Sequence, residues 1–135
     1  MKKRKALTLI ETTIAIFVLL VGVVSILQLY PVGLKTSRFS YHLSVASALA
    51  QGKAEEMLAK NFEEVTSVPR TTVDSSPSSP FHLYDWEAKV SWVDPNNNLA
   101  ESQTKTQIKR IEIIIYWKEG GQSKEYHLNT LYAQK

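Results

Sequence analysis

An uncharged apolar run near the N-terminus constrains this chain more than any other feature. From Thr12 to Leu34 there are 23 residues without a charged side chain; a single acid, Glu11, stands directly before them, and residues 2–5 are all basic. A helix over the 24 residues Leu7–Tyr30 would be about 36 Å long, enough to cross a hydrocarbon core of about 30 Å. Because the cations lie on one flank, we expect the N-terminus in the cytoplasm and the rest of the chain outside.

A cleaved secretory signal peptide is the main alternative for such an N-terminus. The apolar region of a signal peptide spans roughly 7–15 residues and is followed by a cleavage site with small residues. The run in this chain is longer, and no Ala-x-Ala site stands directly after it. The sequence therefore favours a helix that spans a membrane.

Glu11 needs its own explanation, because a charged side chain is costly to place in a bilayer and is a functional candidate by default. In an uncut chain, Glu11 would be an acid in the headgroup zone that the helix dipole favours. If the chain is cut after Ala6, Glu11 becomes the fifth residue of the mature protein. A new α-amino group then lies about one helical turn away. The carboxylate would offset that amine or the amine of a neighbouring subunit.

The segment Lys5-Ala-Leu-Thr-Leu-Ile-Glu11 resembles the leader motif of type IV pilins and pseudopilins. The resemblance implies that a prepilin peptidase cuts between Ala6 and Leu7 and methylates the new N-terminus on Leu7. It also implies that Glu11 supports docking into a growing filament. The family usually has Gly where this chain has Ala6, which is also small. The segment Ala50–Leu58 is similar to minor pilins of the PilV and GspI kind.

Composition gives little support for a nucleic-acid surface. The formal net charge is +3, but residues 1–6 hold four of the 16 Lys and Arg residues, which leaves 12 bases against 13 acids. The excess positive charge thus belongs to the leader. The 135 residues suffice for one modest domain plus an anchor, and the chain has no cysteine for a disulfide or a thiolate site.

Helical spacing continues beyond the apolar run. Pro31 and Gly33 predict a kink or a short break. An apolar stripe at helical spacing then predicts an amphipathic continuation over residues 31–65, with Lys53 as its one charged member and an end near Lys60–Val65. The stripe comprises Phe39, Leu43, Ala46, Ala50, Lys53, Met57 and Leu58. Residues 66–80 are rich in Ser, Thr and Pro, which predicts a loop.

Three segments with period-two alternation of β-branched and aromatic residues predict strands: Phe81–Val93, Gln107–Lys118 and Lys124–Ala133. Turn residues separate them at 94–98 and 119–122. We expect an α+β fold in which the long N-terminal helix packs on a three-stranded antiparallel meander, with residues 81–135 and 31–65 in one globular domain. This is also the pilin-like fold that the resemblance implies.

Other kinds of site find little support. Asp94, Asn96 and Asn98 have the spacing of a calcium loop, but Leu99 and Lys105 stand where an EF-hand requires Gly and Glu, so a turn is favoured. The three histidines, His42, His82 and His127, fall in separate segments without a metal-ligand spacing. His82 and Tyr84 are expected to be exposed at the start of the first strand. We predict no enzyme activity, cofactor or metal site.

These observations lead to one expected function and three alternatives. The chain is expected to be a minor pilin of a type IV pilus-like filament, held first in the cytoplasmic membrane by residues 7–30 and then assembled outside the cell or in the periplasm. Its partners would be the prepilin peptidase, the cytoplasmic membrane and other pilin subunits. The alternatives are a pseudopilin of a type II secretion system, a pseudopilin of a competence system, and an unprocessed membrane-tethered binding domain.

Overall fold

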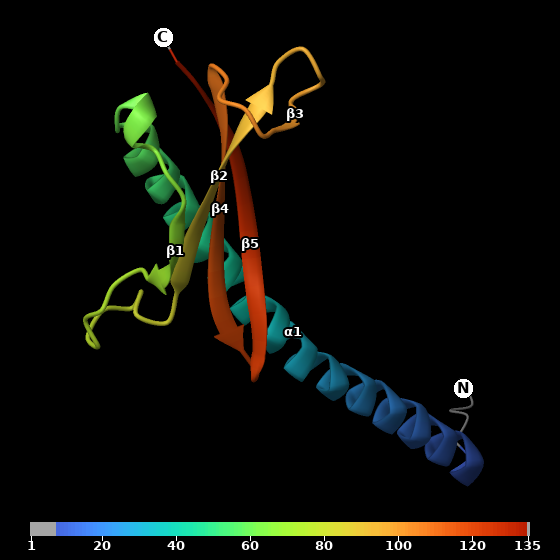
Figure 1. Cartoon of the computed structure of the whole chain (residues 1–135). Helices are drawn as coiled ribbons and strands as arrows, with labels where there is room; N and C mark the ends of the chain where they lie inside the picture. The colour runs from blue at the N-terminus through green and yellow to red at the C-terminus, as the bar shows by residue number, and fades with distance from the viewer. Residues whose placement is uncertain (1–7, 135) are drawn as a thin grey trace. The chain divides into compact units, whose positions relative to one another are not determined.

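A computed structural model describes residues 8–134. The fold is α+β, with one long N-terminal helix whose second half packs on an antiparallel sheet (Figure 1). The elements are α1 (Leu9–Leu58), the 3-10 turn η1 (Phe62–Glu64), and the strands β1 (Val68–Thr72), β2 (Asp85–Asp94), β3 (Ala100–Ser102), β4 (Ile108–Glu119) and β5 (Gln122–Ala133). The chain divides into two compact units, Met1–Phe39 and Ser40–Lys135.

The helix α1 differs from the sequence prediction at two points. No short break occurs at Pro31, because α1 is assigned without interruption from Leu9 to Leu58. A proline removes one backbone donor, and the hydrogen bonds on either side of it hold the helix together. The helix also ends earlier than the predicted Lys60–Val65, and residues 62–64 form the 3-10 turn instead.

The sheet has five strands rather than the predicted three. Its order is β1-β2-β4-β5, all antiparallel, and β3 pairs with the end of β2. β1 lies in the predicted loop, and β3 lies between the predicted turn 94–98 and the predicted strand Gln107–Lys118, where no element was expected. β1 occupies part of the predicted loop 66–80, and its side chains after Val68 are exposed, so no apolar alternation marks it. β3 has only three residues, of which two are exposed.

The two long edges of the sheet differ. β1 contains Pro69, and its register with β2 shifts between Val68 and Thr71. β5 pairs with β4 over all 12 of its residues without a shift, and it contains neither proline nor glycine. Proline and bulges are the usual devices that protect a sheet edge from further pairing, so β1 carries such protection and β5 does not.

The register confirms which residues share the inner face of the sheet. Cross-strand rows join Trp86 with Ile115 and Tyr126, and Ala88 with Ile113 and Leu128. In each strand these residues stand two positions apart, as the period-two alternation of the predicted strands requires. The next row joins Val90, Ile111 and Thr130.

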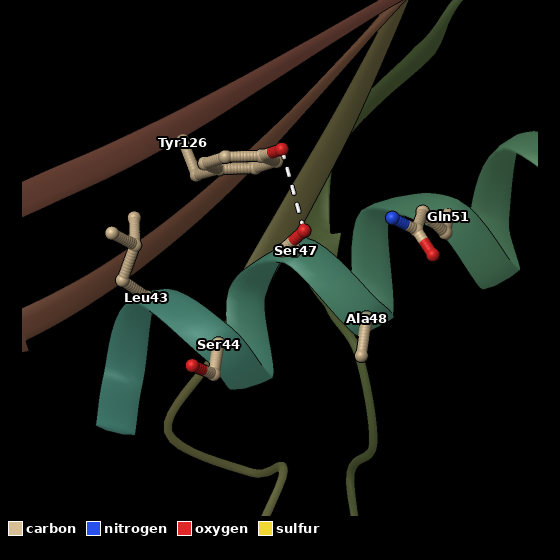
Figure 2. A pocket seen from close by; sticks show the side chains of 6 residues that line it. All are labelled: Leu43, Ser44, Ser47, Ala48, Gln51 and Tyr126. Atoms are coloured by element: carbon tan, nitrogen blue, oxygen red, sulfur yellow. Dashed lines mark hydrogen bonds between the residues drawn. The ribbon is translucent and has the colours of Figure 1, made fainter. Parts of the chain in front are cut away.

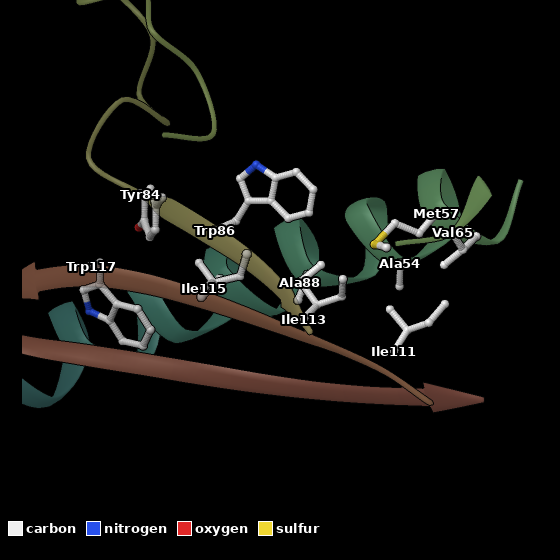
Figure 3. Packing of buried hydrophobic residues seen from close by; sticks show 12 residues of the cluster. Ala54, Met57, Val65, Tyr84, Trp86, Ala88, Ile111, Ile113, Ile115 and Trp117 are labelled. Atoms are coloured by element: carbon white, nitrogen blue, oxygen red, sulfur yellow. The ribbon is translucent and has the colours of Figure 1, made fainter. Parts of the chain in front are cut away.

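The second half of α1 covers this inner face with a stripe of small residues (Figure 3). Ala46 and Ala50 are fully buried, and Ala54 and Met57 are nearly so. Small side chains let the helix backbone come close to the isoleucines and tryptophans of the strands. Of the predicted stripe, Phe39 and Leu43 are instead exposed. Ala54 was not part of the prediction.

Lys109, on β4, binds the segment that follows α1 and so connects that segment to the sheet. It is 4% exposed, and its Nζ donates hydrogen bonds to the carbonyl oxygens of Phe62 at 2.6 Å and Val65 at 2.9 Å. The ammonium also lies 4.7 Å from the centre of the Phe62 ring and 4.6 Å from that of Trp92. These contacts satisfy the buried cation, although no salt bridge to it occurs in the described residues 8–134.

Candidate functional site

Two of the predicted site residues, Ala6 and Leu7, lie outside the described residues. The third, Glu11, lies in the first turn of α1. The structure therefore bears on the predicted docking acid, Glu11, and on the apolar surface of the helical residues that follow it in the chain.

Glu11 forms a reciprocal cap with Thr8, the residue directly before α1. The Thr8 amide donates to Glu11 Oε2 at 3.0 Å and its hydroxyl donates to the same oxygen at 3.1 Å. In return, the Glu11 amide donates to Thr8 Oγ1 at 3.4 Å. This is a capping box, in which a Ser or Thr and an acid three residues later satisfy amides at the helix start. The Thr-x-x-Glu spacing is present in the sequence, but a capping role for Thr8 was not predicted from it.

The apolar surface behind Glu11 is exposed along its whole length. Every residue from Leu9 to Leu34 is exposed in the described structure, including side chains as large as Phe17 and Tyr30. The segment is long and apolar enough to cross a membrane. Such a surface is stable in water only if lipid or other protein covers it.

The Thr and Ser hydroxyl groups within this segment donate to backbone carbonyl oxygens of the helix itself. Thr13 donates to the carbonyl oxygen of Leu9 at 2.7 Å, and Ser25 donates to that of Val21 at 2.7 Å. Polar groups in a hydrocarbon environment need such internal partners, since no water is available there. These side chains can therefore face lipid or an apolar protein surface without an unsatisfied donor.

A shallow groove runs along the second half of α1 beside β5 (Figure 2). The hydroxyl of Ser47 donates to the hydroxyl of Tyr126 at 3.3 Å. The lining residues are Leu43, Ser44, Ser47, Ala48, Gln51 and Tyr126. None of them is a carboxylate, histidine or lysine, and the lining offers hydroxyl and amide groups for hydrogen bonds.

The three histidines lie apart, and the described residues contain no group of three or more metal-ligating side chains. His42 Nδ1 lies 2.6 Å from the hydroxyl of Tyr84. Tyr84 is 2% exposed, so the prediction that it lies at the surface is wrong. Burial raises the pKa of its phenol, and Tyr41 and Glu119 add to the rise. His82 is exposed as predicted.

The outer face of the sheet carries a polar network. His127 lies between two carboxylates, with Nδ1 2.9 Å from Glu112 and Nε2 3.2 Å from Glu125. The hydrogen bonds to Glu112 and then Glu125 raise the pKa of His127. Tyr116 donates to Glu87 at 2.8 Å, and burial followed by this bond raises the pKa of Tyr116 to about 12. These bonds join side chains of neighbouring strands and help to stabilise the pairing of the strands.

The segment after β2 forms the predicted turn. The Asp94 carboxylate accepts a hydrogen bond from the Asn96 amide at 2.8 Å, and the Asp94 carbonyl accepts from the amides of Asn97 and Leu99. The carboxylate is thus used to close the turn, as is common for Asp at such positions.

Comparisons of the chain with protein-family models, with curated proteins and with solved structures give no match. Glu11, the apolar surface of α1 and the motif of residues 5–11 are the features of this chain that bear on its function.

Proposed function

We propose that this chain is a structural subunit, a minor pilin, of a type IV pilus-like filament. In this proposal, a prepilin peptidase removes residues 1–6 and methylates Leu7. The precursor is held in the cytoplasmic membrane with its N-terminus in the cytoplasm and residues 40–135 outside. Assembly then moves the apolar helix from lipid into a bundle of helices from other subunits.

The observation that carries the proposal is a membrane-length apolar helical surface, exposed throughout, with one acid in its first turn. A helix that is apolar all round can exchange lipid for neighbouring helices at small cost, because both surroundings are apolar. The acid would gain on assembly, since the amine of a neighbouring subunit could pair with it. The same properties fit a pseudopilin of a secretion or competence system.

The first experiment measures the N-terminal mass of the chain expressed with and without a prepilin peptidase. We expect loss of Met1–Ala6 and a methyl group on Leu7 only when the peptidase is present. An intact Met1 in membranes that contain an active peptidase would contradict the proposal. The chain would then be an unprocessed membrane-tethered domain.

The second experiment separates docking by Glu11 from its capping role. In Glu11→Gln the side-chain amide oxygen can still accept the hydrogen bonds from Thr8, so the cap is kept while the charge is removed. In the matched control Thr8→Val, the charge is kept and the hydroxyl of the cap is lost.

Both variants should insert into the membrane and lose the leader. Only Glu11→Gln should fail to enter filaments, as measured by shearing filaments from cells and detecting the subunit. Incorporation of Glu11→Gln at the wild-type level would refute charge-based docking. Failure of both variants would show that assembly needs the Thr8 cap as well as the charge of Glu11.

A further inference from the structure

The exposed apolar side chains of the unit 40–135 are concentrated at one end. Within its described part, five large apolar residues are exposed: Tyr41, Leu43, Phe81, Leu83 and Leu131. The first four belong to the start of the helical segment of this unit and to the loop just before β2. The loop lies at the same end of the sheet as the β4–β5 turn, because the start of β2 pairs with the end of β4 (Figure 1).

Tyr84 fixes this loop to the helix. Its hydroxyl contacts His42, and its ring lies 6.5 Å from that of Trp117 (Figure 3). Its backbone closes the loop, since Tyr84 O accepts from the Val73 amide at 2.9 Å and the Tyr84 amide donates to Phe81 O at 3.0 Å. The buried Tyr84 therefore holds its exposed neighbours Phe81 and Leu83 at the end of the unit where the helix begins.

The apolar run ends very near this end of the unit. Only five residues, 35–39, separate Leu34 from Ser40. At any angle between the two units, that length of chain spans at most about 22 Å, and as helix it spans about 9 Å. The polar headgroup layer on each side of a bilayer is about 5–8 Å thick. The end that carries Tyr41 is thus tethered close to the membrane surface.

The chemistry of this end suits a headgroup layer. Aromatic side chains with a polar tip, such as that of Tyr41, are enriched at the boundary between lipid and water. Between the apolar run and the unit lie two cations, Lys35 and Arg38, and no acid. Cations at this depth attract the phosphates of anionic lipids.

We propose that the end of the unit 40–135 formed by Tyr41, Phe81 and Leu83 rests against the phospholipid headgroup layer of the membrane that holds the precursor. The contact explains why exposed apolar side chains gather there rather than over the whole surface. It rests on the membrane-anchored precursor of the proposed function, and it adds a second contact with lipid outside the spanning helix.

The test uses the full-length chain in vesicles of phosphatidylethanolamine and phosphatidylglycerol. Because the chain has no native cysteine, Leu83→Cys can carry a single environment-sensitive fluorophore. Leu131→Cys is the matched control: both leucines are exposed, at 59% and 46%, but Leu131 lies near the end of β5 beside Tyr132, which bonds to Lys60 beyond the C-terminal end of α1. Val21→Cys reports insertion of the apolar helix.

Lipids with a quencher near the headgroup should quench the fluorophore at position 83 at least twofold more than the fluorophore at position 131. Equal quenching at the two positions would overturn the inference, provided that position 21 is quenched by a deep-lying quencher. Shielding of position 83 from aqueous iodide without quenching by lipid would also overturn it, because protein would then cover the site. Absence of quenching at position 21 would instead refute membrane anchoring, and with it this inference.

Discussion

Replacing Lys109 with methionine tests whether the buried ammonium group stabilises the contact between the sheet and the segment that follows α1. The change removes two charge-assisted hydrogen bonds, each worth about 1.5 kcal/mol, and the cation–π contacts with Phe62 and Trp92, worth about 1 kcal/mol together. Methionine keeps the apolar stem and avoids the cost of burying an ammonium, which offsets about half of the loss. We therefore expect Lys109→Met to lower the free energy of unfolding by about 2 kcal/mol.

Tryptophan emission during thermal unfolding of the full chain in detergent micelles measures this loss. Trp92 lies beside the ammonium, and Trp86 and Trp117 lie in the core, so the emission follows the unit 40–135. For a domain of this size, about 2 kcal/mol lowers the midpoint by about 8–16 °C. Lys105→Met is the control, because Lys105 is an exposed lysine that lines the same surface pocket as Lys109. If both variants melt at the same temperature, the bonds of Lys109 do not stabilise the fold.

Two further predictions concern the helix–sheet contact and the outer face. Ala50→Leu should lower the urea midpoint by the equivalent of about 1–3 kcal/mol without changing the m value, because Ala50 is fully buried against the strands, whereas Gln51→Leu should have little effect. NMR titration should give His127 a pKa above 6.5 that returns toward 6.5 in the double variant Glu112→Gln/Glu125→Gln. Since the folded-state pKa is raised, the stabilisation from His127 should be present below pH 6.5 and lost as the pH rises through the folded-state pKa.

The long strands were predictable because each buries alternate residues. β2, β4 and β5 overlap the three predicted segments, and the rows that join Trp86 with Ile115 and Ala88 with Ile113 follow from that alternation. The alternation also predicts the face that α1 covers. Where one face of a strand is buried, the alternation of apolar and polar residues in the sequence indicates which side chains lie on that face.

The remaining features depend on contacts between distant residues or on exposed backbone. β1 has little buried side-chain surface to create a pattern, so its sequence resembles that of a loop. The burial of Lys109 depends on two carbonyl oxygens more than 40 residues earlier in the chain, and no local pattern indicates their position. The cap formed by Thr8 is local and could have been predicted from its spacing to Glu11.

The unequal edges of the sheet limit how copies of this chain can associate through their strands. Open-ended growth by strand pairing needs two compatible edges on each copy, so that every added copy offers a new site for the next. Here the edge of β5 is unprotected, but Pro69 and the register shift obstruct the edge of β1. Pairing through β5 would therefore stop at two copies and could not build a fibre. Any long assembly of this chain has to grow through other surfaces, such as the exposed apolar side chains of Leu9–Leu34.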